Sequence, residues 1–197
     1  MRFTRLLAVM AVAGGIIGFA GGVIAFTAPI ASAATSSTLP YRNPLRSIQS
    51  LKGGRIDQGV DYSGSGPVYA LGDGTVINLY NKGWPSGTFI SYRLSNGPAA
   101  GYVVYVAENV TPRVSKGEHV TTSTVLGTLH NAYPNMEIGW AANKGTGYAM
   151  CHKTYVEGHS TRCGMNMNKL LGVLGAPAGY KQSGYLTGYL PAGFPRW

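Results

Sequence analysis

The sequence predicts a mainly β protein with an antiparallel core and one short helix near its C-terminus. Apolar residues make up 45% of the 197 residues and charged residues only 12%. This composition excludes a disordered chain, because disorder requires high charge and few apolar side chains. The 29 glycines follow no regular period, which excludes a collagen-like helix. Short apolar runs alternate with turns that contain Gly and Pro, a pattern typical of antiparallel strands.

Residues 1–33 have the pattern of an export signal. Arg2 and Arg5 precede an uncharged apolar run at 6–26, and the Ala-Ser-Ala sequence at 31–33 is a small-x-small cleavage pattern. We therefore place signal-peptide cleavage after residue 33. The apolar run is also long enough to span a bilayer, so a retained membrane anchor stays open. In both cases the rest of the chain is expected to be secreted or associated with the cell wall.

The charge of the chain predicts the kind of partner. A formal net charge of +9 on an exported protein favours anionic polymers, which include peptidoglycan-associated and other cell-wall polymers. Nucleic acid is not expected, because Lys and Arg are scattered and no recognition motif is present. Contact with a membrane is expected only if the N-terminal apolar run is retained.

The elements expected after the signal are short. Residues 34–54 show little periodicity and are expected to form an N-terminal leader that wraps onto the domain. Strands are expected at 60–62, 67–71, 75–80, 89–94, 101–107, within 120–129, and at 136–140. A helix is expected over 166–174, with Asn166 as N-cap, a stripe of three leucines, and Gly175 as C-cap. The β domain then covers 55–140, and 141–197 is a C-terminal extension.

Two cysteines in the extension, Cys151 and Cys163, are expected to form a disulfide. Exported proteins fold in an oxidising compartment, where paired thiols are oxidised. A metal site is the competing interpretation, because His152 and His159 lie between the cysteines. Their spacing does not match the usual zinc-finger spacings.

Five motifs follow one another between residues 55 and 140. They are DQGVD at 57–61, GPVYALGDGTV at 66–76, VYVAE at 104–108, VSKGEHV at 114–120 and NMEIGW at 135–140. In this order they resemble the lysostaphin-like (LytM-type) zinc peptidoglycan endopeptidases. The resemblance implies a lysostaphin-like antiparallel β core of the barrel-sandwich hybrid type, and action on peptidoglycan.

The chain departs from that family at every histidine of the site. The positions of the three zinc ligands carry Asp57, Asp61 and Glu137. Asn135 stands at the other position of the family's His-x-His strand, and Glu108 at the position of the remaining catalytic histidine. Four of the seven acidic residues of the chain thus occupy positions of the family's site. We expect these residues to line one cleft, with Glu108, Glu137 and Asn135 as catalytic candidates.

An acidic site of this kind permits two kinds of chemistry. If a metal is bound, Asp57, Asp61 and Glu137 are its expected ligands, and oxygen donors suit Ca²⁺, Mg²⁺ or Mn²⁺ better than Zn²⁺. Crowded carboxyl groups also raise one another's pKa, and a protonated acid beside a carboxylate suits glycoside hydrolysis. The aromatic side chains expected to bind substrate are Trp84, Tyr105 and Trp140.

The sequence leaves three functions open. The protein binds or remodels peptidoglycan or a wall glycan through a degenerate lysostaphin-type site, or it is a carboxylate-based glycan hydrolase, or it is a divergent metallopeptidase that cuts peptidoglycan cross-links. Whether it is an enzyme is not decided by the sequence.

Overall fold

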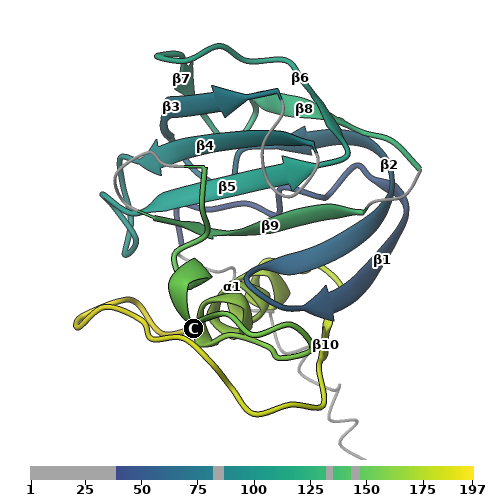
Figure 1. Cartoon of the computed structure of the whole chain (residues 1–197). Coiled ribbons are helices and arrows are strands. Elements are labelled where there is room, and N and C mark those ends of the chain that lie inside the picture. The colour runs from purple at the N-terminus through teal and green to yellow at the C-terminus, as the bar shows by residue number, and fades with distance from the viewer. Residues whose placement is uncertain (1–38, 82–86, 132–134, 143–146) are drawn as a thin grey trace, which may run out of the picture. The chain divides into compact units, whose positions relative to one another are not determined.

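The computed structural model describes residues 39–81, 87–131, 135–142 and 147–197, and Figure 1 shows their arrangement. The strands are β1 (Gln49–Ile56), β2 (Val60–Tyr69), β3 (Gly74–Tyr80), β4 (Thr88–Leu94), β5 (Val103–Glu108), β6 (Val110–Pro112), β7 (His119–Val120), β8 (Val125–Leu129), β9 (Met136–Ala141) and β10 (Tyr180–Lys181). A 3-10 helix, η1 (His152–Thr154), and one α-helix, α1 (Arg162–Val173), complete the described elements. The prediction of a mainly β fold with one C-terminal helix is confirmed.

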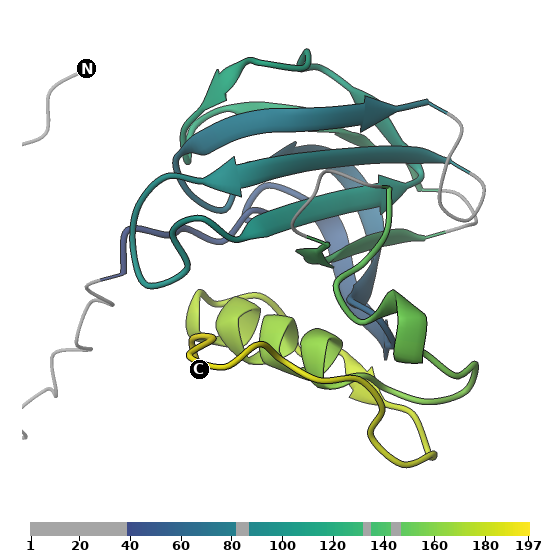
Figure 2. The ribbon, with the colours of Figure 1, turned by 60° about the vertical axis from the view of Figure 1, so that its left-hand side comes forward.

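The strands form a curled, almost entirely antiparallel sheet (Figures 1 and 2). Its order is β10-β1-β2-β9-β5-β4-β3-β7, and β8 pairs with both β2 and β6. Only the β1–β10 pair is parallel among the pairings described. Helix α1 packs against β9, β2 and β1, so the C-terminal extension covers one side of the sheet.

Strand β2 joins two parts of the sheet because it bends at two glycines. Its first half pairs with β1 and β9, and its second half pairs with β8. Gly64 and Gly66 have φ values of +136° and +139°, which side-chain-bearing residues rarely adopt. The sequence predicted separate strands at 60–62 and 67–71, because the glycines interrupt the apolar pattern between them.

The N-terminal leader is shorter than the sequence predicted. Strand β1 begins at Gln49, inside the expected leader at 34–54, and pairs with β2 from that residue onward. Its half-buried polar and glycine residues show no alternation, so pairing with its neighbours rather than periodicity defines the strand. Residues 39–48 do pack on the domain, as expected, and Tyr41 and Leu45 are buried in the core.

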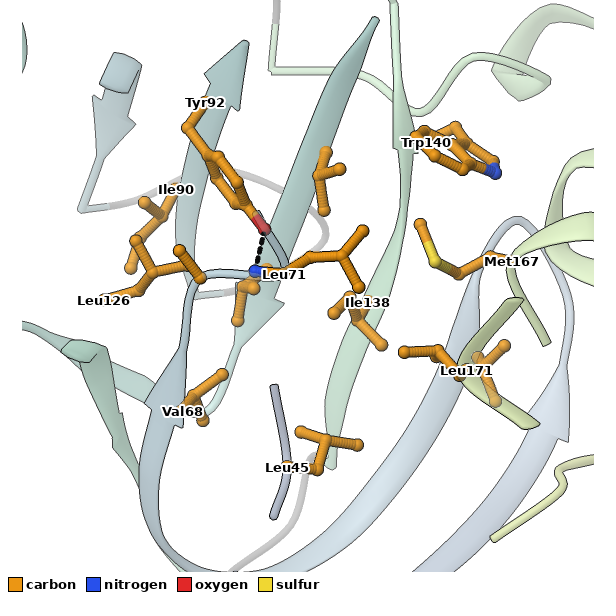
Figure 3. Close-up of a cluster of buried hydrophobic side chains, with 14 of the residues drawn as sticks. Leu45, Val68, Leu71, Ile90, Tyr92, Leu126, Ile138, Trp140, Met167 and Leu171 are labelled. Carbon is orange, nitrogen blue, oxygen red and sulfur yellow. Dashed lines mark hydrogen bonds between the residues drawn. The ribbon is translucent and has the colours of Figure 1, made fainter. Parts of the chain in front are cut away.

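The main core lies between the sheet and α1. Figure 3 shows Met167 and Leu171 of the helix directed toward Ile138 and Trp140 of β9. Buried in the same core, the Tyr92 hydroxyl oxygen accepts a hydrogen bond from the Leu71 N–H at 2.8 Å. The opposite face of β5 and β9 carries a smaller apolar cluster that includes Phe89 and Tyr105.

Helix α1 begins four residues earlier than predicted. Thr161 is the N-cap, and its side-chain oxygen accepts a hydrogen bond from the Gly164 N–H at 2.9 Å. The prediction of Asn166 as N-cap is wrong, because that side chain accepts a hydrogen bond from Trp140 Nε1 at 2.9 Å inside the core. The C-terminal end lies one residue from the prediction: the C-cap is Leu174, and Gly175 follows it with a φ of +88°, typical of the glycine after a helix.

Cys151 and Cys163 form the predicted disulfide, which links the start of η1 to the first turn of α1. Both cysteines are bonded to each other, so they provide no thiolate for a metal. His152 stacks on Tyr148, and His159 Nδ1 contacts the Tyr185 carbonyl oxygen at 3.0 Å.

Replacing both cysteines by Ser is expected to lower the free energy of unfolding by about 3 kcal/mol, because the disulfide closes a short loop in the unfolded chain. Urea denaturation of the variant and the original protein measures the difference. A reductant should then shift the urea midpoint of the original protein and leave that of the variant unchanged. Two free thiols in the denatured, unreduced protein would contradict the disulfide.

Within the residues described, no helix is both long and apolar enough to cross a membrane. The expected export signal, its cleavage site and the apolar run at 6–26 lie outside the described residues.

Candidate functional site

Three carboxyl groups meet where β1, β2 and β9 run side by side. Asp57 follows the last residue of β1, Asp61 lies in β2, and Glu137 lies directly opposite Asp61 in β9. One carboxylate oxygen from each lies within 4.8 Å of the other two. The structure thus brings together the three residues that the sequence offered as metal ligands, and we call them the carboxylate cluster.

The carboxylate cluster is buried. The exposed fractions of Asp57, Asp61 and Glu137 are 3%, 9% and 3%. These side chains therefore lie largely beneath the surface, and that they line one cleft stays a prediction. Gly59 packs close over the cluster, because a Cβ atom at that position would lie 2.7 Å from Glu137 Oε1.

The backbone around Asp57 is held by the C-terminal extension. The Thr161 N–H donates a hydrogen bond to the Asp57 carbonyl oxygen at 2.8 Å, and the Ser160 hydroxyl donates to the Ile56 carbonyl oxygen at 2.6 Å. Gly164 lies so close that a Cβ atom there would be 2.6 Å from the Asp57 carbonyl oxygen. The start of α1 therefore fixes the backbone from which the Asp57 side chain extends.

Arg55 bridges two members of the carboxylate cluster. Its Nη2 lies 3.0 Å from Asp57 Oδ2, and its Nε donates a hydrogen bond to Asp61 Oδ2 at 2.9 Å. Its Nη1 lies 3.1 Å from Glu157 Oε1, which belongs to the disulfide loop. Sequence reasoning missed Arg55 and Glu157. The two-residue period of a strand puts Arg55 on the same face as Asp57, and this period is the signal that could have identified Arg55.

The surroundings of Glu137 in the carboxylate cluster favour its uncharged form. Burial raises its pKa well above the usual range, and the negative charge of Asp57 adds to this rise. Its carboxyl group hydrogen-bonds to Asp57, and its Oε1 accepts a hydrogen bond from the Tyr105 hydroxyl. Burial also raises the pKa of Asp57, while the Arg55 guanidinium and the Gln58 N–H oppose that rise. Burial thus favours the uncharged form of Glu137, while the Arg55 guanidinium and the Gln58 N–H favour the charged form of Asp57.

Two further acids show raised pKa values in the same region. Burial, followed by the charge of Asp57, raises the pKa of Asp61 to about 6. Burial and the charges of Asp61 and Asp57 raise the pKa of Glu108 to about 7. Glu108 is half-buried at the end of β5 and is not one of the three residues of the carboxylate cluster. Its φ of +75° is a strained conformation for a residue with a side chain.

Asn135 is half-buried and directly precedes β9. It lies two residues before Glu137, so the period of an extended chain puts both on one face.

The aromatic residues expected to bind substrate do not form a stacking surface. Tyr105 and Trp140 are fully buried, so this prediction is wrong for both. The Tyr105 ring stacks on Phe89 with 5.0 Å between the ring centroids, while Trp140 packs against α1. Strand alternation directs these two side chains to opposite faces of the sheet, and both faces are covered. Trp84 lies outside the described residues.

The carboxylate cluster does not fit a resident metal ion. It offers no imidazole or thiolate, which zinc sites commonly use. Oxygen donors suit harder cations, but the Arg55 guanidinium already lies about 3 Å from carboxylate oxygens of Asp57 and Asp61. A second cation would be repelled by this guanidinium, and the raised pKa of Glu137 disfavours the ionised form that a metal ligand requires.

Comparisons with known proteins give structural likenesses only. The chain matches no protein-family model, and no curated protein matches it. Its structure is similar to a crystal structure from Pseudomonas aeruginosa named as a peptidase of family M23, with a TM-score of 0.40, 19% identity, and coverage of 53% of this chain and 45% of that chain. It is also similar to the solution structure of lysostaphin, with a TM-score of 0.47, 13% identity, and coverage of 74% of this chain and 60% of that chain.

Proposed function

We propose that this protein is exported and binds peptidoglycan or a related wall glycan. In this proposal it holds no catalytic metal and does not cut the polymer. The observation that carries the proposal is the position of Arg55, whose guanidinium supplies the positive charge between Asp57 and Asp61. In the family that the sequence resembles, zinc stands among the corresponding side chains. A fixed guanidinium neutralises the carboxylates but provides no open coordination position for water or substrate.

The choice of ligand rests on the sequence. The motifs at 57–61 and 66–76 resemble those of peptidoglycan endopeptidases, and the basic composition of the chain favours an anionic wall. The apolar N-terminal run and the disulfide both support export. In this proposal the carboxylate cluster fixes the relative positions of β1, β2 and β9, and the surrounding surface binds the polymer.

Sedimentation with purified peptidoglycan tests the proposal. The protein should bind the insoluble polymer, release neither free amines nor reducing ends, and bind equally well with a chelator present. Glu137→Gln should bind like the original protein, because Gln has the shape of the protonated Glu and carries no charge. Release of amines that a chelator abolishes would overturn the proposal in favour of a metallopeptidase.

A carboxyl-based hydrolase is the second candidate, and a specific observation favours it. The pKa of Glu137 is raised well above the usual range, whereas Arg55 opposes the rise at Asp57, and carboxyl groups whose environments push their pKa values apart suit acid–base hydrolysis. The two groups are hydrogen-bonded to each other, so they would have to separate to about 5 Å or more to flank a glycosidic bond. Because both side chains are buried, this function requires the site to open. Release of reducing ends by the original protein, and its loss in both Glu137→Gln and Asp57→Asn, would establish this candidate.

A further inference from the structure

A second site lies apart from the carboxylate cluster, where the N-terminal leader meets the end of α1. It is a pocket of about 310 Å³ lined by Tyr41, Arg42, Asn43, Arg46, Val173 and Leu174. We call it the Arg42 pocket. Two of these six residues are arginines and none is acidic, so the pocket combines positive charge with an apolar wall.

The positive charge of the Arg42 pocket is not neutralised by the protein. Every ion pair among the described residues is made by Arg55, so no described carboxylate pairs with Arg42 or Arg46. Partial burial and the nearby charge of Arg42 lower the pKa of Arg46. The two like charges therefore repel each other, and an anion between them would relieve the repulsion.

Arg46 is fixed in place, whereas Arg42 is available. Arg46 donates hydrogen bonds to the Asn43 carbonyl oxygen at 3.0 Å and to the Thr122 carbonyl oxygen at 2.7 Å. Its guanidinium carbon lies 3.6 Å from the centroid of the Tyr69 ring. Arg42 is exposed, and its side chain makes no hydrogen bond to the described part of the chain. One guanidinium is thus preorganised, and the other has its donors available for a ligand.

The remaining lining residues limit the kind of anion. The Asn43 side-chain oxygen accepts a hydrogen bond from the Leu45 N–H at 2.8 Å, which leaves its amide nitrogen as a further donor. Val173, with an exposed fraction of 54%, and Leu174 form the apolar wall. Two guanidinium groups match the charge and the several oxygens of a phosphate better than a single carboxylate.

We propose that the Arg42 pocket binds a phosphate group carried on a small organic moiety. Arg42 and Arg46 contact the phosphate oxygens, and Val173 and Leu174 pack against the attached carbon atoms. The same chemistry occurs in phosphate-containing wall polymers and in phospholipid headgroups. The proposal does not rest on the proposed function, because it uses none of the residues of the carboxylate cluster.

Glycerol phosphate is a suitable probe. Calorimetric titration at low ionic strength, with protein purified from cells that express the full chain, should show saturable binding at one site. Arg42→Gln should weaken binding about tenfold or more, because it removes charge-assisted hydrogen bonds. Arg113→Gln is the matched control, since this exposed arginine follows β6, outside the pocket lining. It should bind like the original protein.

The proposal would be overturned by the absence of saturable binding, or by equal weakening in Arg42→Gln and Arg113→Gln. Binding of acetate as strong as that of glycerol phosphate would also overturn it. Arg42→Gln should fold normally, because the Arg42 side chain is exposed and makes no hydrogen bond within the described residues.

Vesicles of phosphatidylglycerol, compared with vesicles of phosphatidylcholine, identify the source of the phosphate. Arg42-dependent binding to the anionic vesicles, displaced by glycerol phosphate, would show that a lipid headgroup can occupy the pocket. Binding of glycerol phosphate without vesicle binding would assign the pocket to a soluble or wall-polymer phosphate.

Discussion

Replacement of Arg55 by Gln is expected to lower the free energy of unfolding by about 3 kcal/mol at pH 8, because it leaves Asp57 and Asp61 buried without a positive partner. Both carboxylates contact this guanidinium at 2.9–3.0 Å. At pH 5 the loss should be smaller, since the carboxyl groups of the variant then take up protons and lose their charge. Urea denaturation at the two pH values measures the effect.

Arg113→Gln is again the control, because an exposed arginine outside such a cluster should change stability by no more than about 0.5 kcal/mol. Adding Asp61→Asn to Arg55→Gln should restore part of the stability at pH 8, since one of the two uncompensated charges is then absent. An equal loss at pH 5 and pH 8 would show that Arg55 stabilises the protein by packing rather than by charge.

The stability of the original protein is expected to fall as the pH rises from 4 to 8. The folded-state pKa values of Asp61 and Glu108 are raised to about 6 and about 7, so the folded state holds protons that the unfolded state has already released. The stabilising contribution of such a group is complete below its unfolded pKa and is lost as the pH rises through its folded pKa. For Asp61 this is on the order of 3 kcal/mol, at about 1.4 kcal/mol per pH unit.

Urea denaturation at intervals between pH 4 and pH 8 measures this dependence. Glu108 acts in the same direction, but its partial exposure to solvent weakens its contribution. Glu137→Gln should show a shallower pH dependence and should exceed the original protein in stability at pH 8, because Gln cannot ionise. A stability that rises steadily from pH 4 to pH 8 would contradict the raised pKa values.

The strands that could be predicted from the sequence are those made of apolar runs that end at turn residues. In β3, β4, β5 and β9, short apolar runs end at glycine, proline or polar turns, and this pattern is visible in the sequence. Strand β1 has no such pattern, because its residues before Ile56 are polar or glycine, apart from Leu51, and are exposed or only partly buried. It is defined by its pairing with the adjacent β2 and with β10 from the C-terminal end of the chain, which periodicity does not record.

The carboxylate cluster could be predicted only in part. The motifs predicted that Asp57, Asp61 and Glu137 belong to one site, and the structure brings the same three together. The contact of Arg55 with Glu157 joins residues 102 positions apart, and no motif connects them. Asn166 was misplaced for a different reason: Asn is equally suited to cap a helix and to accept a hydrogen bond from a buried indole.

The backbone at Ile56 and Asp57 is held by the C-terminal extension, and this contact bears on the order in which parts of the protein fold. The hydrogen bond from Ser160 to Ile56 spans 104 positions, and the chain is synthesised from its N-terminal end. We therefore expect the carboxylate cluster to be among the last parts to form, after α1 has been released. Until then its acids remain hydrated and ionised, so the nascent protein carries more negative charge than the finished one. We therefore expect formation of the site to be accompanied by proton uptake.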